Sequence, residues 1–532
     1  MKHVTKLASL LLALVMVFAL TTTAFAATVT NQTSHSYAAY QIFSGTQADN
    51  SVQLGDVEWG SGIDGVGFLA ELQTDTRFNV GESNANIFAS CTTAADVAAA
   101  LGNNSGVAKA FANVAAKHLT TSSTSIAANA DSVELAAGYY LLVDTSTPGD
   151  GDAMNSALLQ VTNSGDIKIE KKYSAPSVDK SVKDTDNAWG ESADWEIGSD
   201  VPFRIVGTLP SNYDDYETYR YVFHDTLQNT LKYNGDVKVY VQNGNTKTEL
   251  TNGFTVAPNT SATTGGGTLT VTFDNLKSIA GVSATSKIIV EYTAELLSTA
   301  VIGKPGNKNE VYLEYSNNPN STGEGTPSTS NTPKDEVLVF TYELDVTKVD
   351  GQNTNKKLAN AEFVLLNSEK TKVAKVADGK FVEWVDVPAA IDGKSTYPEG
   401  ATLTSATDGK FVIAGLDAGN YVLRETKAPA GYNLLKNDIE LVITATLDKS
   451  ENTPALTDLK LSVKEDKGEA TVTESDGAVD TGIVSTNVEN NSGAQLPETG
   501  GIGTTIFYVL GGLLVLTAVV LLVTKKRMSA KA

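Results

Sequence analysis

An alternating row of apolar and polar side chains runs through residues 419–432, GNYVLRETKAPAGY. In a β-strand successive side chains point to opposite faces, so Tyr421, Leu423 and Glu425 share one face. A carboxylic acid therefore stands in an apolar row, and we expect Glu425 to be buried. Short alternating segments of this kind, separated by turns of Asn, Asp and Gly, recur along the chain. The pattern predicts an all-β fold built of sandwich domains.

Two lysines stand in apolar rows in the same way. Lys180 lies in VDKSV at residues 178–182, and Lys348 closes LDVTK at residues 344–348. Burial of a lysine is unfavourable unless its charge is paired or its amine is used chemically. The alternative is a surface lysine whose head group reaches water past the apolar face.

An asparagine and an acid on two other segments are also expected to point inward, as Lys180 does. Asn309 begins the inward row of residues 309–315, and Asp225 lies on the apolar face of residues 221–227. Burial lowers the pKa of a lysine and raises that of a carboxylic acid. The neutral amine of Lys180 can then attack the carbonyl of Asn309 while protonated Asp225 polarises it, and ammonia leaves. We expect an intramolecular isopeptide bond here, with a surface lysine and a turn asparagine as the alternative.

Composition excludes several classes of function. The chain has 532 residues and a formal net charge of −22, which argues against nucleic-acid binding. With the single cysteine Cys91, no internal disulfide is expected. The four histidines have no metal-ligand spacing, so we predict no metal site. We also predict no cofactor and no enzymatic turnover. One acidic stretch is interpreted as a solvated loop, with a cation site as the alternative; it contains Asp184, Asp186, Glu191 and Asp194.

Both ends of the chain carry targeting signals. Residues 1–26 combine a basic start, an apolar core and a small-x-small cleavage site, which predicts a secretory signal peptide. The apolar run at residues 506–523 is long enough to span a bilayer as a helix. Basic residues at 525–527 keep the end after this run on the cytoplasmic side. Everything between the two signals is therefore expected outside the cell.

Residues 496–500, LPETG, match the pattern LPXTG and are followed by an apolar span and a basic tail. This order resembles a Gram-positive cell-wall sorting signal. The resemblance implies that a sortase cleaves between Thr499 and Gly500 and passes the acyl group of Thr499 to an amine. The alternative is a plain membrane anchor with a chance pentapeptide. The motif consists of Leu496, Pro497, Glu498, Thr499 and Gly500.

Three units are expected between these ends. The first, residues 27–172, is predicted to be β with a helical insertion at residues 94–118, which is broken near residues 102–106. The second spans residues 177–335 and the third residues 338–492. Residues 495–532 hold the sorting signal, the predicted transmembrane helix and the basic tail.

Residues 421–432 meet every fixed position of YxLxETxAPxGY, the E-box of sortase-assembled Gram-positive pilins. Residues 306–319 resemble the final strand of isopeptide-forming pilin domains. The mature chain as a whole resembles the major, or backbone, subunit of such a pilus. This resemblance implies tandem immunoglobulin-like, Cna-type β-sandwich domains.

The E-box resemblance implies a second internal bond, promoted by Glu425 and formed by Lys348. The partner asparagine is expected on the last strand before the sorting signal. Alternation puts Asn490 on the face of Val484 and Val488, which favours Asn490, with Asn487 as the alternative. The first unit has no lysine and asparagine that match the pattern, so we expect two internal bonds.

The end of the first unit resembles the pilin motif that carries the acceptor lysine. Residues 167–172, IKIEKK, align with VxVYPK, although Glu170 and Lys171 replace Tyr and Pro. Alternation directs Lys172 to solvent. We therefore favour Lys172 as the acceptor, with Lys171 second and a solvated lysine pair at a domain boundary as the alternative.

The resemblance implies a structural pilus subunit, in which Thr499 of one copy is joined to Lys172 of the next in support of adhesion. The implied partners are a pilus-specific (class C) sortase, a housekeeping sortase, peptidoglycan, tip or minor pilins, and host surface ligands that the sequence does not identify. The implied location is the cell wall. A monomeric wall-anchored adhesin and a wall-anchored enzyme are the alternatives.

Overall fold

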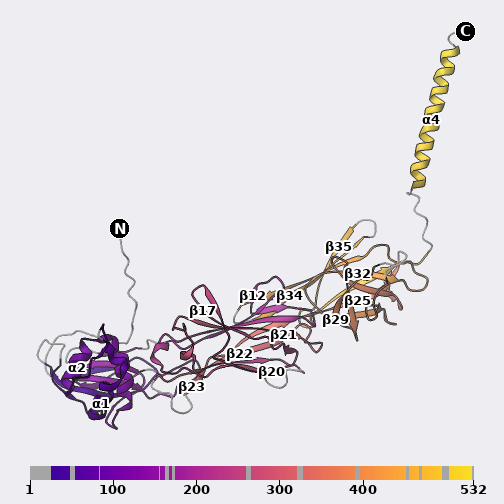
Figure 1. The fold of residues 1–532 in the computed structure, drawn as a ribbon. Helices are drawn as coiled ribbons and strands as arrows, with labels where there is room; N and C mark the ends of the chain where they lie inside the picture. Colours follow the sequence, from indigo (N-terminus) through magenta and orange to yellow (C-terminus); the bar gives the residue numbers. More distant parts are fainter. Residues whose placement is uncertain are drawn as a thin grey trace.

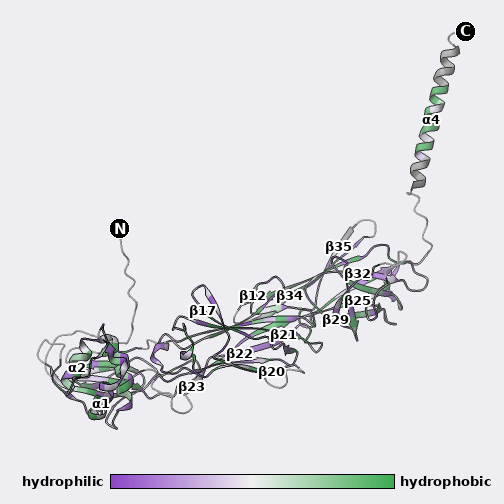
Figure 2. Cartoon of the chain, in the orientation of Figure 1, coloured by the Kyte–Doolittle hydropathy of each residue, from purple (hydrophilic) through white to green (hydrophobic). Residues whose placement is uncertain are grey.

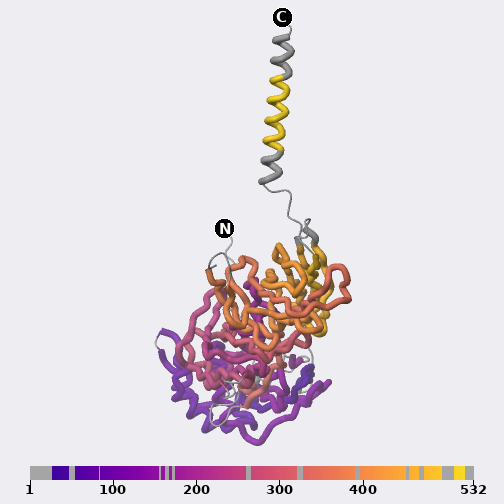
Figure 3. Tube along the Cα trace, turned by 90° about the vertical axis from the view of Figure 1, so that its right-hand side faces the viewer, coloured from indigo at the N-terminus to yellow at the C-terminus, as the bar shows by residue number. Residues whose placement is uncertain are grey.

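The computed structural model describes residues 26–47, 54–82, 84–154, 156–161, 167–170, 174–258, 265–319, 328–389, 396–450, 454–466, 470–493 and 502–529. Figure 1 shows three β-rich units in a row, with helix α4 (Ile502–Ser529) beyond the third. The view turned by 90° looks along this row, so that the units overlap, and helix α4 again extends beyond them (Figure 3). The all-β prediction is confirmed.

The first unit combines two small sheets and the two-stranded β4-β5 sheet with a helical layer. The sheet order β10-β1-β7 joins its first and last strands, and the order β3-β2-β8-β9 forms the other sheet, with β6 paired to β2. The strands are β1 (Ala26–Asn31), β2 (Tyr37–Gln47), β3 (Leu54–Trp59), β4 (Asn79–Val80), β5 (Ala85–Asn86), β6 (Thr124–Ile126), β7 (Val133–Ala136), β8 (Gly138–Asp144), β9 (Ser156–Val161) and β10 (Ile167–Ile169).

The predicted helical insertion of the first unit is present and broken where expected. α2 (Ala94–Gly102) and α3 (Ala108–Lys117) are separated by a short 3₁₀ turn. Thr93 caps α2 through the backbone N–H of Asp96, and the Asp96 carboxylate accepts from the Thr93 N–H. The sequence did not predict α1 (Gly65–Thr74), whose Phe68 packs edge-on against the aromatic ring of Phe111.

The second unit is a sandwich of two sheets. One has the order β12-β11-β14-β21-β17-β18, with β16 paired to β21, and the other β13-β24-β22-β15-β20-β19, with β23 paired to β22. The first sheet contains β11 (Val178–Lys183), β12 (Trp189–Gly190), β14 (Asp200–Thr208), β16 (Leu231–Tyr233), β17 (Lys238–Asn243), β18 (Thr246–Leu250) and β21 (Lys287–Leu296). The second contains β13 (Ser192–Asp194), β15 (Tyr221–Leu227), β19 (Thr255–Pro258), β20 (Gly267–Phe273), β22 (Asn307–Ser316), β23 (Thr329–Asn331) and β24 (Asp335–Phe340).

The third unit is one long sheet with the order β26-β25-β31-β29-β28-β27-β32-β33-β34-β35. Its last strand, β36, pairs in parallel with its first, β25. The strands are β25 (Tyr342–Asp350), β26 (Asn353–Lys357), β27 (Glu362–Asn367), β28 (Lys372–Ala377), β29 (Lys380–Asp386), β30 (Leu403–Thr404), β31 (Lys410–Leu416), β32 (Gly419–Lys427), β33 (Ile439–Asp448), β34 (Ala455–Asp466), β35 (Ala470–Asp476) and β36 (Ile483–Asn490).

Backbone and side-chain contacts join the first unit to the second. The N–H of Gly151 donates to the carbonyl of Asn331 at 2.6 Å. Buried His35 contacts the carboxylates of Asp144 and Asp152 at 2.5 and 2.6 Å, one through each ring nitrogen. The hydroxyl of Tyr315, on β22, donates to the carbonyl of Asp152 at 2.8 Å. The segment around Asp152 is thus held by His35 of its own unit and by residues of the second unit.

Helix α4 forms over the predicted apolar run, and Figure 2 shows hydrophobic residues along its described part. Among the described residues, no helix combines the length and the hydropathy that crossing a membrane requires.

Several sequence predictions fall outside the described residues. They concern residues 1–25 of the predicted signal peptide, the candidate acceptors Lys171 and Lys172, and the sorting pentapeptide at residues 496–500.

Candidate isopeptide sites

The second unit brings together Lys180, Asp225 and Asn309 in its core. Lys180 lies on β11, and the other two lie on β15 and β22 of the opposite sheet. The register pairs Asp225 with Val311 and Leu227 with Asn309, so the acid and the amide point inward from neighbouring strands. All three side chains are at most 1% exposed. The three residues that the sequence selected therefore form one buried cluster.

A tyrosine that the sequence did not select completes this cluster. The Lys180 Nζ donates to Asp225 Oδ1 at 2.8 Å and lies 3.3 Å from the Tyr292 hydroxyl. The Tyr292 hydroxyl donates to Asp225 Oδ2, and Asn309 Nδ2 donates to the same hydroxyl at 2.6 Å. Tyr292 lies on β21, and its inward phase was the only sequence signal that could have drawn attention to it.

Burial sets the protonation of the cluster. Desolvation lowers the pKa of Lys180, although the neighbouring carboxylate opposes the shift. Desolvation also raises the pKa of Asp225, against the opposing effect of the lysine. The aromatic rings of Phe203 and Tyr292 lie with their centroids 5.4 and 5.5 Å from Nζ and keep water away. Both shifts favour a neutral amine and a protonated acid, the pair needed for attack on an amide.

A second buried asparagine on β22 has a different role. Asn307 accepts from the N–H of Val301 at 2.8 Å through Oδ1. Its Nδ2 donates to the carbonyls of Val301 and Val339 at 3.1 and 2.9 Å. In contrast, Asn309 Oδ1 is buried and has no hydrogen-bond partner among the described residues. Asn307 therefore holds a loop, whereas Asn309 has a carbonyl oxygen available for polarisation.

The third unit brings together Lys348 on β25, Glu425 on β32 and Asn490 on β36. Lys348 Nζ donates to Asn490 Oδ1, and also to the carbonyl of Val488 at 3.0 Å. Asn490 Nδ2 donates to both carboxylate oxygens of Glu425, at 2.9 and 3.1 Å. The amine and the acid thus approach the same side-chain amide from opposite ends.

The acid of the third unit is buried, as the alternation of its strand predicts. Glu425 is 6% exposed, and desolvation raises its pKa. Its Oε2 accepts from the N–H of Leu435 at 2.8 Å, and its Oε1 lies 3.9 Å from Lys348 Nζ. Asn487, the alternative partner, is exposed on the other face of β36. The geometry therefore puts Asn490, rather than Asn487, next to the lysine.

The lysines of the first unit have other surroundings. Among its described residues none is buried; Lys109 and Lys117 pair with Asp215 and Glu71, and Lys168 is exposed on β10. The alternation predicted for residues 167–169 is present, because Ile167 and Ile169 are buried on either side of Lys168.

The interpretation of the acidic stretch as a solvated loop is wrong for two of its residues. Glu191 and Asp194 are buried, because this stretch packs against the third unit. Asp194 accepts from the Tyr342 hydroxyl at 2.9 Å, and Asp184 pairs with Lys449 at 2.6 Å. Within the described ranges, no group of three or more His, Cys, Asp or Glu side chains could hold a metal ion.

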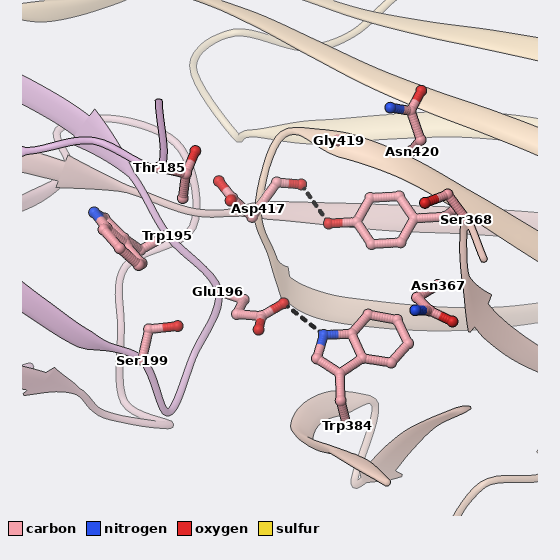
Figure 4. Close-up of a pocket in the computed structure, with 11 residues that line it drawn as sticks. Thr185, Trp195, Glu196, Ser199, Asn367, Ser368, Trp384, Asp417, Gly419 and Asn420 are labelled. Carbon is pink, nitrogen blue, oxygen red and sulfur yellow. Dashed lines mark hydrogen bonds between the residues drawn. The ribbon is translucent and has the colours of Figure 1, made fainter. Parts of the chain in front are cut away.

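A pocket lies at the same junction, between the second and third units (Figure 4). Trp384 Nε1 donates to Glu196 across it at 2.8 Å. Asp417 also lines the pocket, and burial together with neighbouring Asp194 raises its pKa to about 10. No residue of either lysine cluster lines this pocket, so the candidate chemistry lies inside the units.

Two family models match the chain. One describes a prealbumin-like fold domain, named SpaA, and matches residues 342–458. The other describes the LPXTG cell wall anchor motif and matches residues 488–529. The prealbumin-like match contains Lys348 and Glu425, and the anchor match begins just before Asn490.

Known proteins share similarity over much of the chain. The Trypsin-resistant surface T6 protein of Streptococcus pyogenes serotype M6 is 22% identical over 442 residues, which are 73% of this chain and 75% of that protein. Fimbrial subunit type 2 of Actinomyces naeslundii is 27% identical over 348 residues, 57% of this chain and 59% of that protein. The chain thus spans less than two thirds of the second relative. This chain carries a cell-wall anchor motif and is similar in sequence to a fimbrial subunit.

Solved structures of pilins are similar to this wall-anchored protein. The T6 backbone pilin of serotype M6 Streptococcus pyogenes has 17% identity and a TM-score of 0.48, with 88% of this chain and 98% of that one covered. The full-length major pilin SpaD of Corynebacterium diphtheriae has 18% identity and a TM-score of 0.44, with 88% and 97% covered.

Proposed function

We propose that this chain is the backbone subunit of a covalently polymerised surface pilus, and that each of its second and third units is closed by a Lys–Asn isopeptide bond. The observation that carries the proposal is the pair of buried lysine–asparagine–acid clusters in a wall-anchored chain. Named similarity to a fimbrial subunit supports it.

The internal reaction needs no external enzyme. The neutral amine of Lys180 or Lys348 attacks the Cγ of Asn309 or Asn490. The protonated acid polarises the carbonyl, and the tetrahedral intermediate collapses with loss of Nδ2 as ammonia. The amine gives up one proton and the leaving nitrogen gains one, so each bond removes one ammonia. The acid is restored, and the reaction occurs once per site.

A bond of this kind suits a fibre under tension. Lys348 and Asn490 are 142 residues apart in sequence, so their bond closes nearly the whole third unit. By analogy with a disulfide, loop closure on this scale stabilises the folded state by on the order of 4 kcal/mol through chain entropy. It also prevents the first and last strands from separating when the chain is pulled from its ends.

The bond between subunits repeats this chemistry with a sortase as catalyst. The sortase cleaves after Thr499 and transfers the acyl group to Lys172 of the next subunit, with Lys171 as the alternative acceptor. β10 ends at Ile169, just before these lysines, so the acceptor follows a strand paired to β1. Each subunit thereby carries a donor at one end and an acceptor after its first unit. A pilus-specific class C sortase polymerises the subunits, and a housekeeping sortase attaches the polymer to peptidoglycan.

The polymer is tested by immunoblots of cell-wall extracts boiled in detergent. Wild type is expected to give a ladder of high-mass bands, and Lys172→Ala is expected to collapse it. Lys168→Ala is the matched control, because Lys168 is exposed on β10 and precedes the candidates. A ladder that collapses in Lys171→Ala instead moves the acceptor by one residue. A single band in wild type would favour the monomeric adhesin over a pilus.

The internal bonds are tested by the intact mass of the mature chain. The mass is expected to fall below the sequence mass by two ammonia units. Lys180→Ala and Lys348→Ala are each expected to restore one of them. A wild-type mass equal to the sequence mass would overturn both internal bonds and leave the polymer test unaffected.

A further inference from the structure

We propose that Tyr292 is a catalytic residue of the second unit, which relays a proton from Asp225 to the side-chain carbonyl oxygen of Asn309. The proposal rests on the isopeptide chemistry proposed above and adds a fourth residue to one of its two sites.

The hydroxyl of Tyr292 contacts all three reacting side chains. It lies 3.3 Å from Lys180 Nζ and 2.6 Å from Asn309 Nδ2, and it contacts Asp225 Oδ2. The hydrogen bonds of Asp225 within the described residues go to Lys180 and Tyr292 rather than to Asn309. The acid therefore reaches the amide through the phenol.

The ring that carries this hydroxyl is held in place. Tyr292 is 3% exposed and stacks on Phe203 with centroids 5.5 Å apart and an interplanar angle of 25°. Tyr233 packs on it edge-on at 5.8 Å. On β21, Tyr292 pairs with Phe203 of β14, the strand that also pairs with β11. Its position relative to Lys180 is thus set by the sheet itself.

The orientation of the Asn309 amide follows from its partners. Within the part of the chain that the structure describes, Asn309 Oδ1 is buried without a hydrogen bond, while Nδ2 occupies the position next to Tyr292. The oxygen and nitrogen of an amide are distinguished by their hydrogen bonds, and rotation by half a turn exchanges them. Rotation puts Oδ1 next to the Tyr292 hydroxyl, which can then donate to it. This rotated amide is the reactive orientation, because its carbonyl is polarised.

The proton balance of the relay closes. Lys180 Nζ attacks Cγ of Asn309 as Tyr292 passes its proton to Oδ1, and Tyr292 takes the proton of Asp225 in the same movement. The Cγ–Nδ2 bond then breaks, the amine proton leaves with Nδ2 as ammonia, and the Oδ1 proton returns through Tyr292 to Asp225. Burial and neighbouring Asp225 hold the pKa of Tyr292 well above its ordinary value, so the phenol stays protonated between transfers.

The third unit supplies an internal comparison. There the Glu425 carboxylate contacts the Asn490 amide directly, at 2.9 and 3.1 Å, and Lys348 contacts Asn490 Oδ1. The same half-turn of this amide puts Oδ1 directly next to the Glu425 carboxyl, so no intermediate hydroxyl is needed. The relay is therefore expected in the second unit and not in the third.

The test follows the loss of ammonia over time in the full mature chain carrying Lys348→Ala, so that only the second unit can react. Mass spectra are taken at intervals after cell-free synthesis. Tyr292→Phe is expected to slow the reaction at least tenfold, and Asp225→Asn to abolish it. Tyr221→Phe is the matched control, because it removes a buried hydroxyl of the same core that donates to the carbonyl of Thr208 at 2.8 Å.

A reaction at the parent rate in Tyr292→Phe, or an equal slowing in Tyr221→Phe, would overturn the relay. A second measurement needs no variant of the tyrosine. In the attack step the relay moves two protons, whereas direct donation by the acid of the third unit moves one, so bond formation in D₂O is expected to slow more in the second unit than in the third. Equal slowing would also overturn it. If the Lys348→Ala parent never loses ammonia, the isopeptide chemistry itself fails, which is a distinct result.

Discussion

The two lysine clusters contain the same three residue types in different architectures. In the second unit, Lys180 lies on one sheet and Asn309 on the other, so their bond would join the two sheets. In the third unit, Lys348 and Asn490 lie on β25 and β36, which are parallel neighbours in one sheet. The acid contacts Tyr292 in the first case and the side-chain amide directly in the second. The comparison teaches that a lysine, an asparagine and an acid can be brought together in a buried cluster by two different strand topologies.

The largest expected effect is a loss of stability, measured separately for each of the two clusters. Lys180→Ala and Lys348→Ala should each lower the free energy of unfolding of their own unit by at least about 4 kcal/mol, because each removes a long closed loop. Thermal unfolding of the mature chain, with intact mass measured in parallel, checks this. A variant that loses one ammonia fewer than wild type but unfolds at the same free energy would show that the bond adds no stability to that unit.

The next effect tests whether each acid is needed for bond formation in its own unit. Asp225→Asn and Glu425→Gln keep shape but cannot supply a carboxylic proton, so each should abolish bond formation in its own unit and spare the other. Peptide mapping after digestion distinguishes the Lys180–Asn309 cross-link from the Lys348–Asn490 cross-link. Full bond formation in Glu425→Gln would remove the acid from the mechanism of the third unit, although its hydrogen bonds to Asn490 would remain a structural feature.

A smaller effect concerns pH. Burial raises the pKa of Glu425 in the folded chain, so the protonated form stabilises the fold. This contribution is present at low pH and is lost as the pH rises through the raised folded value. In Lys348→Ala, which cannot form the bond, stability should therefore fall with rising pH more steeply than in Lys348→Ala with Glu425→Gln. Denaturant titrations across that range provide the measurement, and parallel curves would contradict it.

The smallest effect tests the choice of asparagine. Asn487 is exposed on β36, so Asn487→Ala should change stability by no more than about 0.5 kcal/mol and leave the ammonia loss intact. Asn490→Ala should abolish the bond of the third unit. The reverse outcome would require β36 to shift by three residues relative to β25, so that Asn487 takes the position of Asn490.

Sequence alternation anticipated much of both clusters. It put Lys180, Asp225, Asn309, Lys348, Glu425 and Asn490 on inward faces, and all six are buried. This succeeded because the side-chain period of a strand is two, so one apolar row determines the face of every residue in it. Alternation was also sufficient to prefer Asn490 over Asn487.

The same reasoning could not find Tyr292. An inward tyrosine in an apolar row is an ordinary core residue, and nothing in residues 287–296 indicates which groups lie opposite. The prediction for the acidic stretch failed for a related reason, because its burial depends on contacts with the third unit, 148 to 265 residues later in the chain. Asp184 meets Lys449 only when the two units pack together.

The sequence by itself determined the strand faces, the break between α2 and α3, the E-box and the anchor motif, because each depends on neighbours a few residues apart. Only the tertiary structure decided which faces meet. It placed Asn309 on the sheet opposite Lys180 and Asn490 on the strand next to that of Lys348. It also placed Tyr292 between the acid and the amide of the second unit. Those choices depend on strand order and sheet packing, which bring together residues more than a hundred positions apart in sequence.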